Sequence, residues 1–449
     1  MESNKEKVME VETHGVEPIP DGERHGKPRQ MFSLWFAVSL NVSTWFTGFL
    51  GIEFGLSLKY VIIAIIIGNV LGASYLALSS AVGAELGQPL IPASLKVFGK
   101  AGVIGLSFLN LINNIGWLAV NLGLAVMALL SVVHIEYHVA LILLTAVTLI
   151  VAVYGYNFIH AFAHVMSIIV GFLFAIMTII TIANLHTIVA HSTSAIGGFN
   201  LSMFILTIAV TFSYQISYCP VGSDYTRYQP KDSSKTKLWG FSFAGALTAC
   251  LWLEVLGALT AALGTQLSPM DFFAKFMGFF TIPAIITVII SIIPSNAMAM
   301  YSGGLAALAM GIRLKRWISA VLTAVIGALL ISFGNGSFTA IYTNFLLLLS
   351  YWIVPWLGVV LFDFYYSKKI PSEKNNKEGW IGLASFLFGI AFSVPFMNSS
   401  LYVGYIASKY FNGADISYLI SLIVSVLIYI ILIKLRGNKE QFTKSVELQ

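Results

Sequence analysis

The stretch "FSYQISYCPVGSDYTRY", residues 212–228, starts as an apolar segment and reaches Pro220 and Gly222 before its first charge. Proline removes a backbone donor and glycine tolerates an unwound chain, so we expect a helix to break here. A second stretch, "SLNVSTWFTGFLGIEFG" at residues 39–55, carries three glycines and predicts another interrupted helix. Backbone groups freed at membrane depth must face protein, water or a ligand. The alternative is that the glycines permit close helix packing and the proline only kinks its helix.

The chain as a whole is strongly apolar. Of its 449 residues, 57% are hydrophobic and 10% are charged, and the mean hydropathy is +0.84. A soluble protein of this length needs more charge to cover its surface. Apolar runs long enough to span a bilayer recur between residues 33 and 435, and they are continuous rather than alternating. This pattern predicts an all-α polytopic membrane protein.

Twelve such runs can be separated. We expect transmembrane spans at residues 33–56, 60–82, 101–131, 139–157, 162–184, 200–222, 239–264, 280–311, 317–333, 339–365, 379–397 and 415–435. With these boundaries, 22 of the 25 Lys and Arg residues fall on the side that carries both chain ends. The positive-inside rule then places both termini in the cytoplasm and the protein in the plasma or inner membrane. Residues 1–32 and 436–449 are expected to be polar cytoplasmic tails.

The two interrupted spans are the first and the sixth. They lie five spans apart, as the first helices of two five-helix repeats would, at residues 33–184 and 200–365. The eleventh and twelfth spans, within residues 379–435, complete the chain. Interrupted helices at matching positions of inverted repeats mark the substrate site of many transporters.

Asparagines follow one face of the third span. In the stretch "NNIGWLAVN", residues 113–121, and just before it, Asn110, Asn114, Trp117 and Asn121 are spaced by four, three and four residues. This spacing puts them within one arc of a helix. Amides need partners in hydrocarbon, so the arc should face the interior, where an indole ring stacks on a flat heterocycle and amides bind its edge. The alternative is that the amides join neighbouring helices.

Two further spans add polar side chains. The eighth span contains "SIIPSNAMAMYSGG" at residues 291–304, where we expect Pro294 to break the helix. Its polar residues are Ser291, Ser295, Asn296 and Tyr301. The sixth span contributes Gln215, Ser217, Tyr218 and Asp224.

Several of these stretches carry a family resemblance. The segments "NIGWLAV" (114–120), "GSDYTRYQP" (222–230) and "SNAMAMYSGG" (295–304), with the lead-in "GVEPIPDGERHGKP" (15–28), resemble the nucleobase–cation symporter-1 family, most of all its purine–cytosine permease branch. The resemblance covers about residues 15–365. It implies a leucine-transporter-like fold of 5+5 inverted repeats plus two helices. It also implies alternating access, with a nucleobase held between the third, sixth and eighth spans.

The resemblance also implies roles for single residues. Trp117 matches the tryptophan that stacks on the base, and Asn296 matches an asparagine near the substrate. Asn114 stands where bacterial cytosine permeases have a glutamine. The segment expected to close the other face of the base contains Gln215, Ser217 and Tyr218, of which Tyr218 would form a sandwich with Trp117. With Asn121 of the polar arc, these residues make up the predicted substrate site.

The coupling ion is expected to be a proton rather than sodium. Sodium-coupled members of the family place two neighbouring hydroxyls on the eighth helix, and here the pair is Pro294 and Ser295. Proline supplies no hydroxyl, and sodium needs several hard oxygens. Acids within spans are functional candidates, which makes Glu53, Glu85, Asp224 and Glu254 the candidate proton carriers. Further candidates for ion coupling are Ser291, Ser295, Asn41 and Thr44.

Together these features predict secondary active uptake of cytosine or a purine by cation symport. We expect no cofactor, no nucleic-acid partner and a monomer surrounded by lipid. A first alternative keeps the fold but carries a hydantoin, allantoin, a nucleoside, pyridoxine or a thiamine-precursor pyrimidine, or uses sodium. A membrane-embedded enzyme would need clustered metal ligands or a nucleophile–base pair, and the sequence shows neither pattern. A passive channel is disfavoured by interrupted helices in both repeats.

Overall fold

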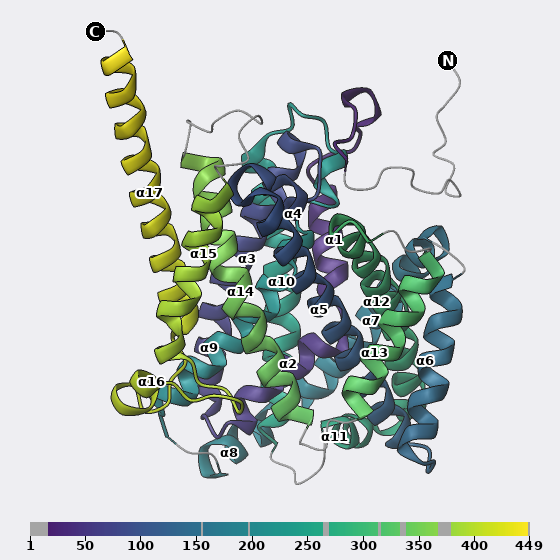
Figure 1. Ribbon diagram of the computed structural model, residues 1–449. Coiled ribbons are helices and arrows are strands. Elements are labelled where there is room, and N and C mark those ends of the chain that lie inside the picture. Colours follow the sequence, from purple (N-terminus) through teal and green to yellow (C-terminus); the bar gives the residue numbers. More distant parts are fainter. Residues whose placement is uncertain are drawn as a thin grey trace.

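The protein is mainly helical in the computed structural model shown in Figure 1. The structure describes residues 17–153, 156–195, 198–263, 269–312, 316–332, 338–366 and 379–447. Its α-helices are α1 (Gln30–Ser39), α2 (Val42–Glu53), α3 (Leu58–Leu86), α4 (Leu90–Ala93), α5 (Leu95–Leu130), α6 (Tyr137–Val153), α7 (Tyr156–Ala183), α8 (Leu185–Ala195), α9 (Leu201–Ile216), α10 (Lys235–Ala261), α11 (Pro269–Met277), α12 (Thr281–Ala309), α13 (Arg316–Ser332), α14 (Phe338–Tyr366), α15 (Gly379–Ser393), α16 (Tyr405–Tyr410) and α17 (Ser417–Glu447). Its 3-10 helices are η1 (Asp21–Glu23), η2 (Cys219–Val221), η3 (Thr226–Tyr228), η4 (Gly278–Phe280) and η5 (Val394–Phe396).

Most of these helices suit a membrane. In the described ranges, nine helical segments are long and apolar enough to cross a bilayer, and the bent pair α1 and α2 makes a tenth. Two shorter apolar helices, Tyr137–Ile150 and Trp317–Ser332, occupy the expected fourth and ninth positions. The first described residues and the end of α17 lie at the same end of the molecule, at the top of Figure 1. We call this end the N/C face. The protein is therefore a multi-pass membrane protein, while the count of twelve crossings stays a prediction.

The first span is interrupted, but not at its glycines. It bends by 59° between α1 and α2, at Leu40 and Asn41. Asn41 is extended, and its side chain accepts a hydrogen bond from the backbone N–H of Thr44 at 3.0 Å. A short polar side chain at this position caps a new helix rather than continuing the old one. The predicted break is confirmed, and its predicted position was wrong, because Gly48 and Gly51 lie inside α2.

The sixth span breaks where the sequence predicted. α9 ends at Ile216, and the chain continues through η2 and η3 instead of a regular helix. Pro220 occupies the first turn of η2, where its missing N–H has no helical partner to lose. Ser217 closes α9, and its hydroxyl donates to the carbonyl oxygen of Tyr214 at 2.6 Å.

Four spans pack together as a group that we call the bundle: the α1–α2 pair, α3, α9 and α10. Their backbones approach very closely at glycines. A Cβ atom on Gly48 of α2 would overlap the backbone of Glu254 in α10, and one on Gly257 of α10 would overlap the carbonyl oxygen of Trp45. Gly48 therefore serves close packing of α2 on α10, which was the alternative interpretation of these glycines.

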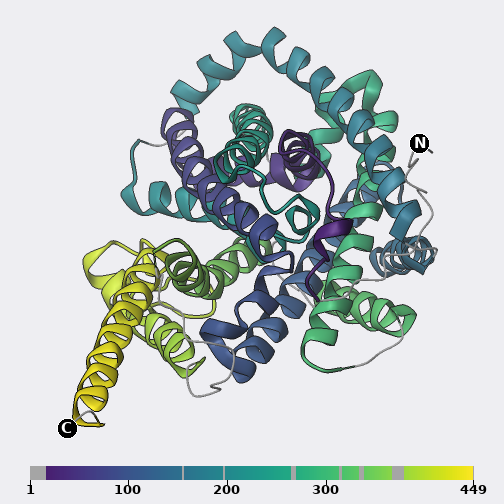
Figure 2. The same ribbon diagram turned by 90° about the horizontal axis from the view of Figure 1, so that it is seen from above.

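The second group, which we call the scaffold, contains α5, α6, α7, α12 and α13. α5 and α12 run antiparallel, because Gly303 of α12 faces Leu111 and Asn114, and later residues of α12 lie beside Ser107. Figure 2 shows α15 and α17, in yellow-green and yellow, together at one edge of the molecule. α14 connects this edge to the rest, since it contacts α17, α9 and α5.

Three expectations about helix ends were wrong. α12 runs without interruption through position 294, so the eighth span is not broken there; transmembrane helices tolerate proline when neighbouring groups satisfy the freed carbonyl. α17 continues to Glu447 instead of ending in a tail at residue 436. Two short helices, α8 and α11, occupy loops in which the sequence analysis placed no helix.

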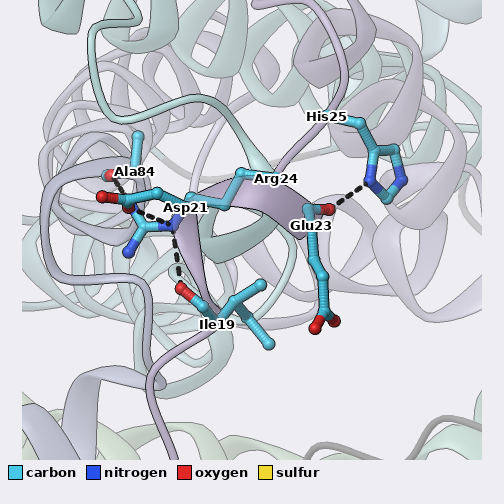
Figure 3. A network of polar contacts seen from close by, with 6 residues as sticks. All are labelled: Ile19, Asp21, Glu23, Arg24, His25 and Ala84. Atoms are coloured by element: carbon cyan, nitrogen blue, oxygen red, sulfur yellow. Dashed lines mark hydrogen bonds and ion pairs between the residues drawn. The ribbon is translucent and has the colours of Figure 1, made fainter.

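The N-terminal segment makes contacts of its own. Residues 17–29, which we call the N-terminal strap, were expected to belong to a flexible or interfacial tail, and they lie against the end of α3 (Figure 3). Arg24 donates to the carbonyl oxygens of Ala84 at 2.8 Å and Ile19 at 3.0 Å. The backbone N–H of Ile19 donates to the carbonyl oxygen of Gly87 at 2.8 Å. A charged donor that satisfies two carbonyls holds the strap on the N/C face. Residues 1–16 lie outside the described part.

Candidate substrate site

Aromatic rings from three helices meet around Trp117 of α5. Tyr214 of α9 and Phe345 of α14 present their edges to the indole, with ring centroids 5.5 and 5.4 Å away. Tyr342 of α14 lies 6.2 Å away at 70°. Edge-to-face contacts fix the plane of the central ring. The third span, the sixth span and the tenth span thus hold Trp117 in one orientation.

The ring of Tyr218 is almost parallel to that of Trp117. The two centroids are 6.4 Å apart and the planes differ by only 16°. Two ring contacts of about 3.5 Å each, on either side of a flat ligand, would need a separation of about 7 Å. The observed distance between the centroids, 6.4 Å, is close to that separation. The two residues therefore have the orientation that the predicted sandwich requires.

A hydroxyl network joins this aromatic group to the break in the first span. The hydroxyl oxygens of Tyr214 and Thr44 are 2.6 Å apart, and those of Tyr214 and Tyr218 are 3.2 Å apart. Asn41 donates to the Tyr214 hydroxyl at 3.1 Å. Thr44 also donates to the carbonyl oxygen of Ser39 at 2.7 Å, where α1 ends. The two interrupted spans are thus linked through Tyr214.

Tyr214 and Tyr342 were missing from the predicted site. A spacing signal existed for Tyr214, since it lies four residues before Tyr218 and so shares its helix face. No such signal existed for Tyr342, which reaches the site from α14. Its hydroxyl lies 2.8 Å from that of Thr47 and donates to the carbonyl oxygen of Ser43 at 3.3 Å.

Asn296 is the most unusual polar residue of the scaffold. Its side chain is fully buried, and neither its amide nitrogen nor its amide oxygen has a hydrogen-bond partner among the described residues. Seven residues separate it from Gly303, or about 10 Å along α12. Because α12 is antiparallel to α5, this places Asn296 at the level of Trp117 and Asn121. A buried amide without partners is costly, so this position calls for a polar ligand or water.

The other asparagines of α5 are used differently. The amide nitrogen of Asn114 donates to the carbonyl oxygen of Asn110, one turn earlier, at 2.7 Å. That of Asn113 lies 3.4 Å from the side-chain oxygen of Asn110. Asn121 is buried on the same face as Trp117. One of the two N–H donors of Asn114 is therefore occupied within its own helix, and its second N–H and its amide oxygen remain to bind a ligand.

Gln215 does not belong to the aromatic group. Its amide nitrogen donates to Asn69 of α3 and to the carbonyl oxygen of Ala246 in α10, both at 3.2 Å. It follows Tyr214 directly, and successive residues point about 100° apart around a helix. The side chain therefore faces the bundle interior, and its contact with the substrate stays a prediction. Ser217 likewise turns back onto the end of α9.

The four candidate acids lie in four different environments. Glu53 is exposed and accepts from Thr339 at 2.8 Å, at the end opposite the N/C face. Glu85 pairs with Lys235 at the N/C face. Asp224 is half-buried and lines a cleft. Glu254 is fully buried inside the bundle, where one carboxylate oxygen accepts from Asn69 at 2.5 Å.

The candidate ion ligands of the eighth span do not gather around the first-span break. The hydroxyl of Ser291 donates to the carbonyl oxygen of Val288 on its own helix at 2.7 Å. Ser295 is half-buried on α12, which packs chiefly on other scaffold helices. Within the described ranges, no group of three or more His, Cys, Asp or Glu side chains is placed to hold a metal ion.

A cleft separates the scaffold from the end of the sixth span. Its lining comes from Ser107 and Asn110 of α5, Pro220 and Asp224 after α9, and Ser302 of α12. Including open solvent, it contains about 380 Å³ of empty space. Asn110 lies two helical turns before Trp117, so this part of the cleft is about 10 Å from the aromatic group along α5.

Known proteins share this architecture. A family model described as a permease for cytosine/purines, uracil, thiamine and allantoin matches residues 18–421. The chain belongs to this permease family. The permease is 30% identical over 456 residues to YxlA of Bacillus subtilis, provisionally named a purine-cytosine permease, and the match covers 96% of this chain and 98% of YxlA. It is 22% identical over 390 residues to the vitamin B6 transporter TPN1 of Saccharomyces cerevisiae, covering 80% and 66% of the two chains.

The fold of the permease matches a solved transporter. Mhp1, a nucleobase-cation-symport-1 family transporter in a closed conformation with bromovinylhydantoin bound, superposes with a TM-score of 0.74 at 16% identity, covering 96% of this chain and 97% of Mhp1. The predicted all-α, leucine-transporter-like fold and the family resemblance are confirmed. The permease is a transporter and not an enzyme.

Proposed function

We propose that the permease imports a nucleobase, cytosine or a purine, together with a proton by alternating access. The observation that carries this proposal is the unpartnered, fully buried amide of Asn296 at the level of an aromatic pair, Trp117 and Tyr218, whose planes are parallel. A base offers a flat face for stacking and donors and acceptors along its edge. Aliphatic cargo would use neither feature.

Roles follow for the remaining residues. Trp117 and Tyr218 hold the two faces of the base, and Asn296 binds its edge. Asn121 and the free amide oxygen of Asn114 are placed to supply further edge contacts. Tyr214 ties this site to the broken first span through Thr44, so that filling the site shifts the bundle relative to the scaffold.

The cleft supplies the release path in this proposal. It opens at the N/C face, between the scaffold and the end of the sixth span. At the opposite end, Phe338 and Tyr342 of α14 stack at 6.1 Å, and Phe46 of α2 contacts both rings. With both termini in the cytoplasm of the cell, as the Lys and Arg distribution favours, the cleft faces inward. The unit of transport would be a monomer in lipid, without a nucleic-acid partner.

The proposed coupling ion is a proton. Position 294 of the eighth span is a proline, which has no hydroxyl, and the hydroxyl of Ser291 donates to a carbonyl oxygen of its own helix. Sodium needs several oxygens directed at one point. A sodium-coupled cycle remains the direct competitor, and it predicts uptake that depends on a sodium gradient.

A second cargo is favoured by the comparisons. TPN1 is named a vitamin B6 transporter, and the solved Mhp1 structure holds a hydantoin. Both are flat, polar heterocycles that the same aromatic pair would accommodate. One bidentate pair between an amide side chain and the edge of a base discriminates against the wrong base by only about 1–3 kcal/mol.

The test is uptake of labelled cytosine into proteoliposomes, with an inward proton gradient and no sodium. Unlabelled purines, uracil, allantoin, a hydantoin and pyridoxine serve as competitors. Accumulation that collapses with the gradient, and competition by bases alone, supports the proposal. Competition by pyridoxine or hydantoin without competition by any base would contradict the cargo. The variant Asn296→Ala should weaken binding at least tenfold if its amide forms one hydrogen bond to the base, which is worth about 1.5 kcal/mol.

A further inference from the structure

The bundle interior contains a carboxyl group with an incomplete set of partners. Glu254 of α10 is fully buried. Its Oε2 atom accepts a hydrogen bond from the amide of Asn69 at 2.5 Å, and its Oε1 atom has no partner among the described residues. A buried carboxylate normally requires a cation or several donors. One amide donor is too little to hold the anion, so the carboxyl group is neutral and carries a proton in this conformation.

Among the residues that the structure describes, no basic group stands close enough to Glu254 to replace that proton. α2 contributes Gly48, whose Cα faces the backbone of Glu254, and α3 contributes the neutral Asn69. The titratable neighbours are Cys250 on α10 and Tyr342 on α14, both of which are uncharged near pH 7. Glu254 has no ion pair among the described residues, in contrast to Glu85, which pairs with Lys235.

The surrounding amides are oriented for a carboxyl group rather than for a metal ion. Asn69 directs its N–H at Glu254 Oε2 and also donates to the carbonyl oxygen of Ile65 at 3.0 Å. Its amide oxygen accepts from Gln215 at 3.2 Å, which uses one of its two lone pairs. Sodium requires oxygen atoms around it, and here the nearest group is a donor.

A short chain of contacts connects this carboxyl group to the substrate site. Gln215 donates to Asn69, Asn69 donates to Glu254, and Gln215 directly follows Tyr214. Tyr214 contacts Trp117 with its ring and Thr44 with its hydroxyl. Gln215 also lies two residues before Ser217, where α9 ends. Rearrangement of the broken sixth span would therefore alter the donors that reach Glu254, which is a direct physical link between the two sites.

We infer that Glu254 is the proton-binding group of the transport cycle, held by Asn69, which in turn accepts a hydrogen bond from Gln215. One proton adds to Oε1 and converts the carboxylate to a carboxylic acid, and the same O–H bond breaks when the bundle opens to the other side. Asn69 is a positioning residue, because it supplies the donor that steadies the anion. This inference rests on the proposed proton-coupled transport and names the site that binds the proton.

The first test is infrared spectroscopy of the purified protein, with Glu254→Gln as the variant. The wild type should show the carbonyl stretch of a protonated carboxylic acid at neutral pH, sensitive to deuterium exchange, and this band should be lost in Glu254→Gln. The exposed acid provides the matched control: Glu53→Gln should keep the band. Absence of the band in the wild type, or its survival in Glu254→Gln, overturns the assignment. This measurement does not depend on which molecule is transported.

The second test separates coupling from transport. Glu254→Gln should lose proton-driven accumulation in proteoliposomes and lose substrate-induced proton uptake measured with a pH dye, while counterflow exchange of the same base continues. Accumulation by the variant at the wild-type level overturns the inference. Accumulation by the wild type that needs sodium and ignores the proton gradient overturns it too, but leaves the nucleobase proposal intact. A wild type that transports no base contradicts the cargo instead, and the infrared result then decides the proton site.

The positioning role has its own readout. Asn69→Leu removes the donor to Oε2 and makes the carboxylate harder to form, so the pH at which transport is half-maximal should move upward. A purely structural defect would lower the transport rate at every pH without moving that midpoint, and this outcome contradicts the role of Asn69. Should Glu254→Gln fail to fold, the pH profile of Asn69→Leu and the wild-type infrared band still test the inference.

Discussion

The hydroxyl oxygens of Thr44 and Tyr214 lie 2.6 Å apart, although 170 residues separate them in the chain. Thr44 lies just after the break of the first span, and Tyr214 lies just before the break of the sixth. This contact therefore links the two points at which the helical backbone is interrupted. It also orders the aromatic group, because the ring of Tyr214 presents its edge to Trp117 at 5.5 Å.

Replacing Tyr214 with phenylalanine tests this link. The ring should remain against Trp117, while the contacts of its hydroxyl with Asn41, Thr44 and Tyr218 are lost. We expect the free energy of unfolding to fall by about 1–3 kcal/mol, because buried partners lose a hydrogen bond, and transport to slow more than binding weakens. Unfolding curves and transport rates measure both. The exposed Tyr366 gives a matched control in Tyr366→Phe. Equal behaviour of the two variants would contradict the linking role.

Truncation of Trp117 tests stacking. Trp117→Ala should weaken binding of the base by about 1–3 kcal/mol, or roughly 5- to 150-fold, since that is the contribution of a base stacked on an aromatic ring. Trp117→Phe should recover part of the loss. Equilibrium binding on detergent-purified, monodisperse protein provides the measurement. Unchanged affinity in Trp117→Ala would remove the stacking role, whatever the fate of transport.

Adding one methyl group at Gly48 should damage the bundle. The new Cβ would overlap the backbone of Glu254, and backbone cannot rotate away as a side chain can. We expect Gly48→Ala to lower stability by about 1–3 kcal/mol or more, as overpacking does. Gly105→Ala is the matched control, because nothing lies within 4 Å of its Cβ position. Thermal unfolding should separate the two, and similar melting temperatures would contradict the close approach of α2 and α10.

Arg24 should control release of the N-terminal strap. Arg24→Ala removes the charged donor to the carbonyl oxygens of Ala84 and Ile19. Hydrogen bonds from a charged group contribute about 1.5–3 kcal/mol, so the population of the released strap should rise roughly 10- to 150-fold. Trypsin should then cut between Arg29 and Gln30 faster than in the wild type. Asp21→Ala should have little effect, because Asp21 is exposed and a surface ion pair contributes little. Equal cleavage rates in Arg24→Ala and the wild type would show that other contacts hold the strap.

The sequence was sufficient for the architecture and for part of the site. Long apolar runs predict membrane helices because nothing else satisfies backbone groups in lipid. Trp117 and Asn296 were found because an aromatic ring or an amide is conspicuous in an apolar span. The break after Ile216 was found because Pro220 marks it. These signals are local, so a single sequence contains them.

Other features depended on contacts between distant segments. The first span breaks at Asn41 rather than at its glycines, because Gly48 is needed against α10 and Asn41 caps the new helix. Gln215 turns toward Asn69 because of its rotation about α9, which the sequence analysis did not apply to the site. The strap was expected to be flexible or interfacial, and nothing in its composition reveals that Arg24 reaches the carbonyl oxygens of Ala84 and Ile19.

The closeness of α2 and α10 at Gly48 and Gly257 has a mechanical consequence. Where two backbones are in direct contact, no side chain lies between them that could change its rotamer when the helices are pushed together. A force applied at one end of these helices is therefore passed on as rotation of the pair instead of being absorbed by soft side chains. The bundle therefore moves as a rigid body that contains both the first-span break and Glu254.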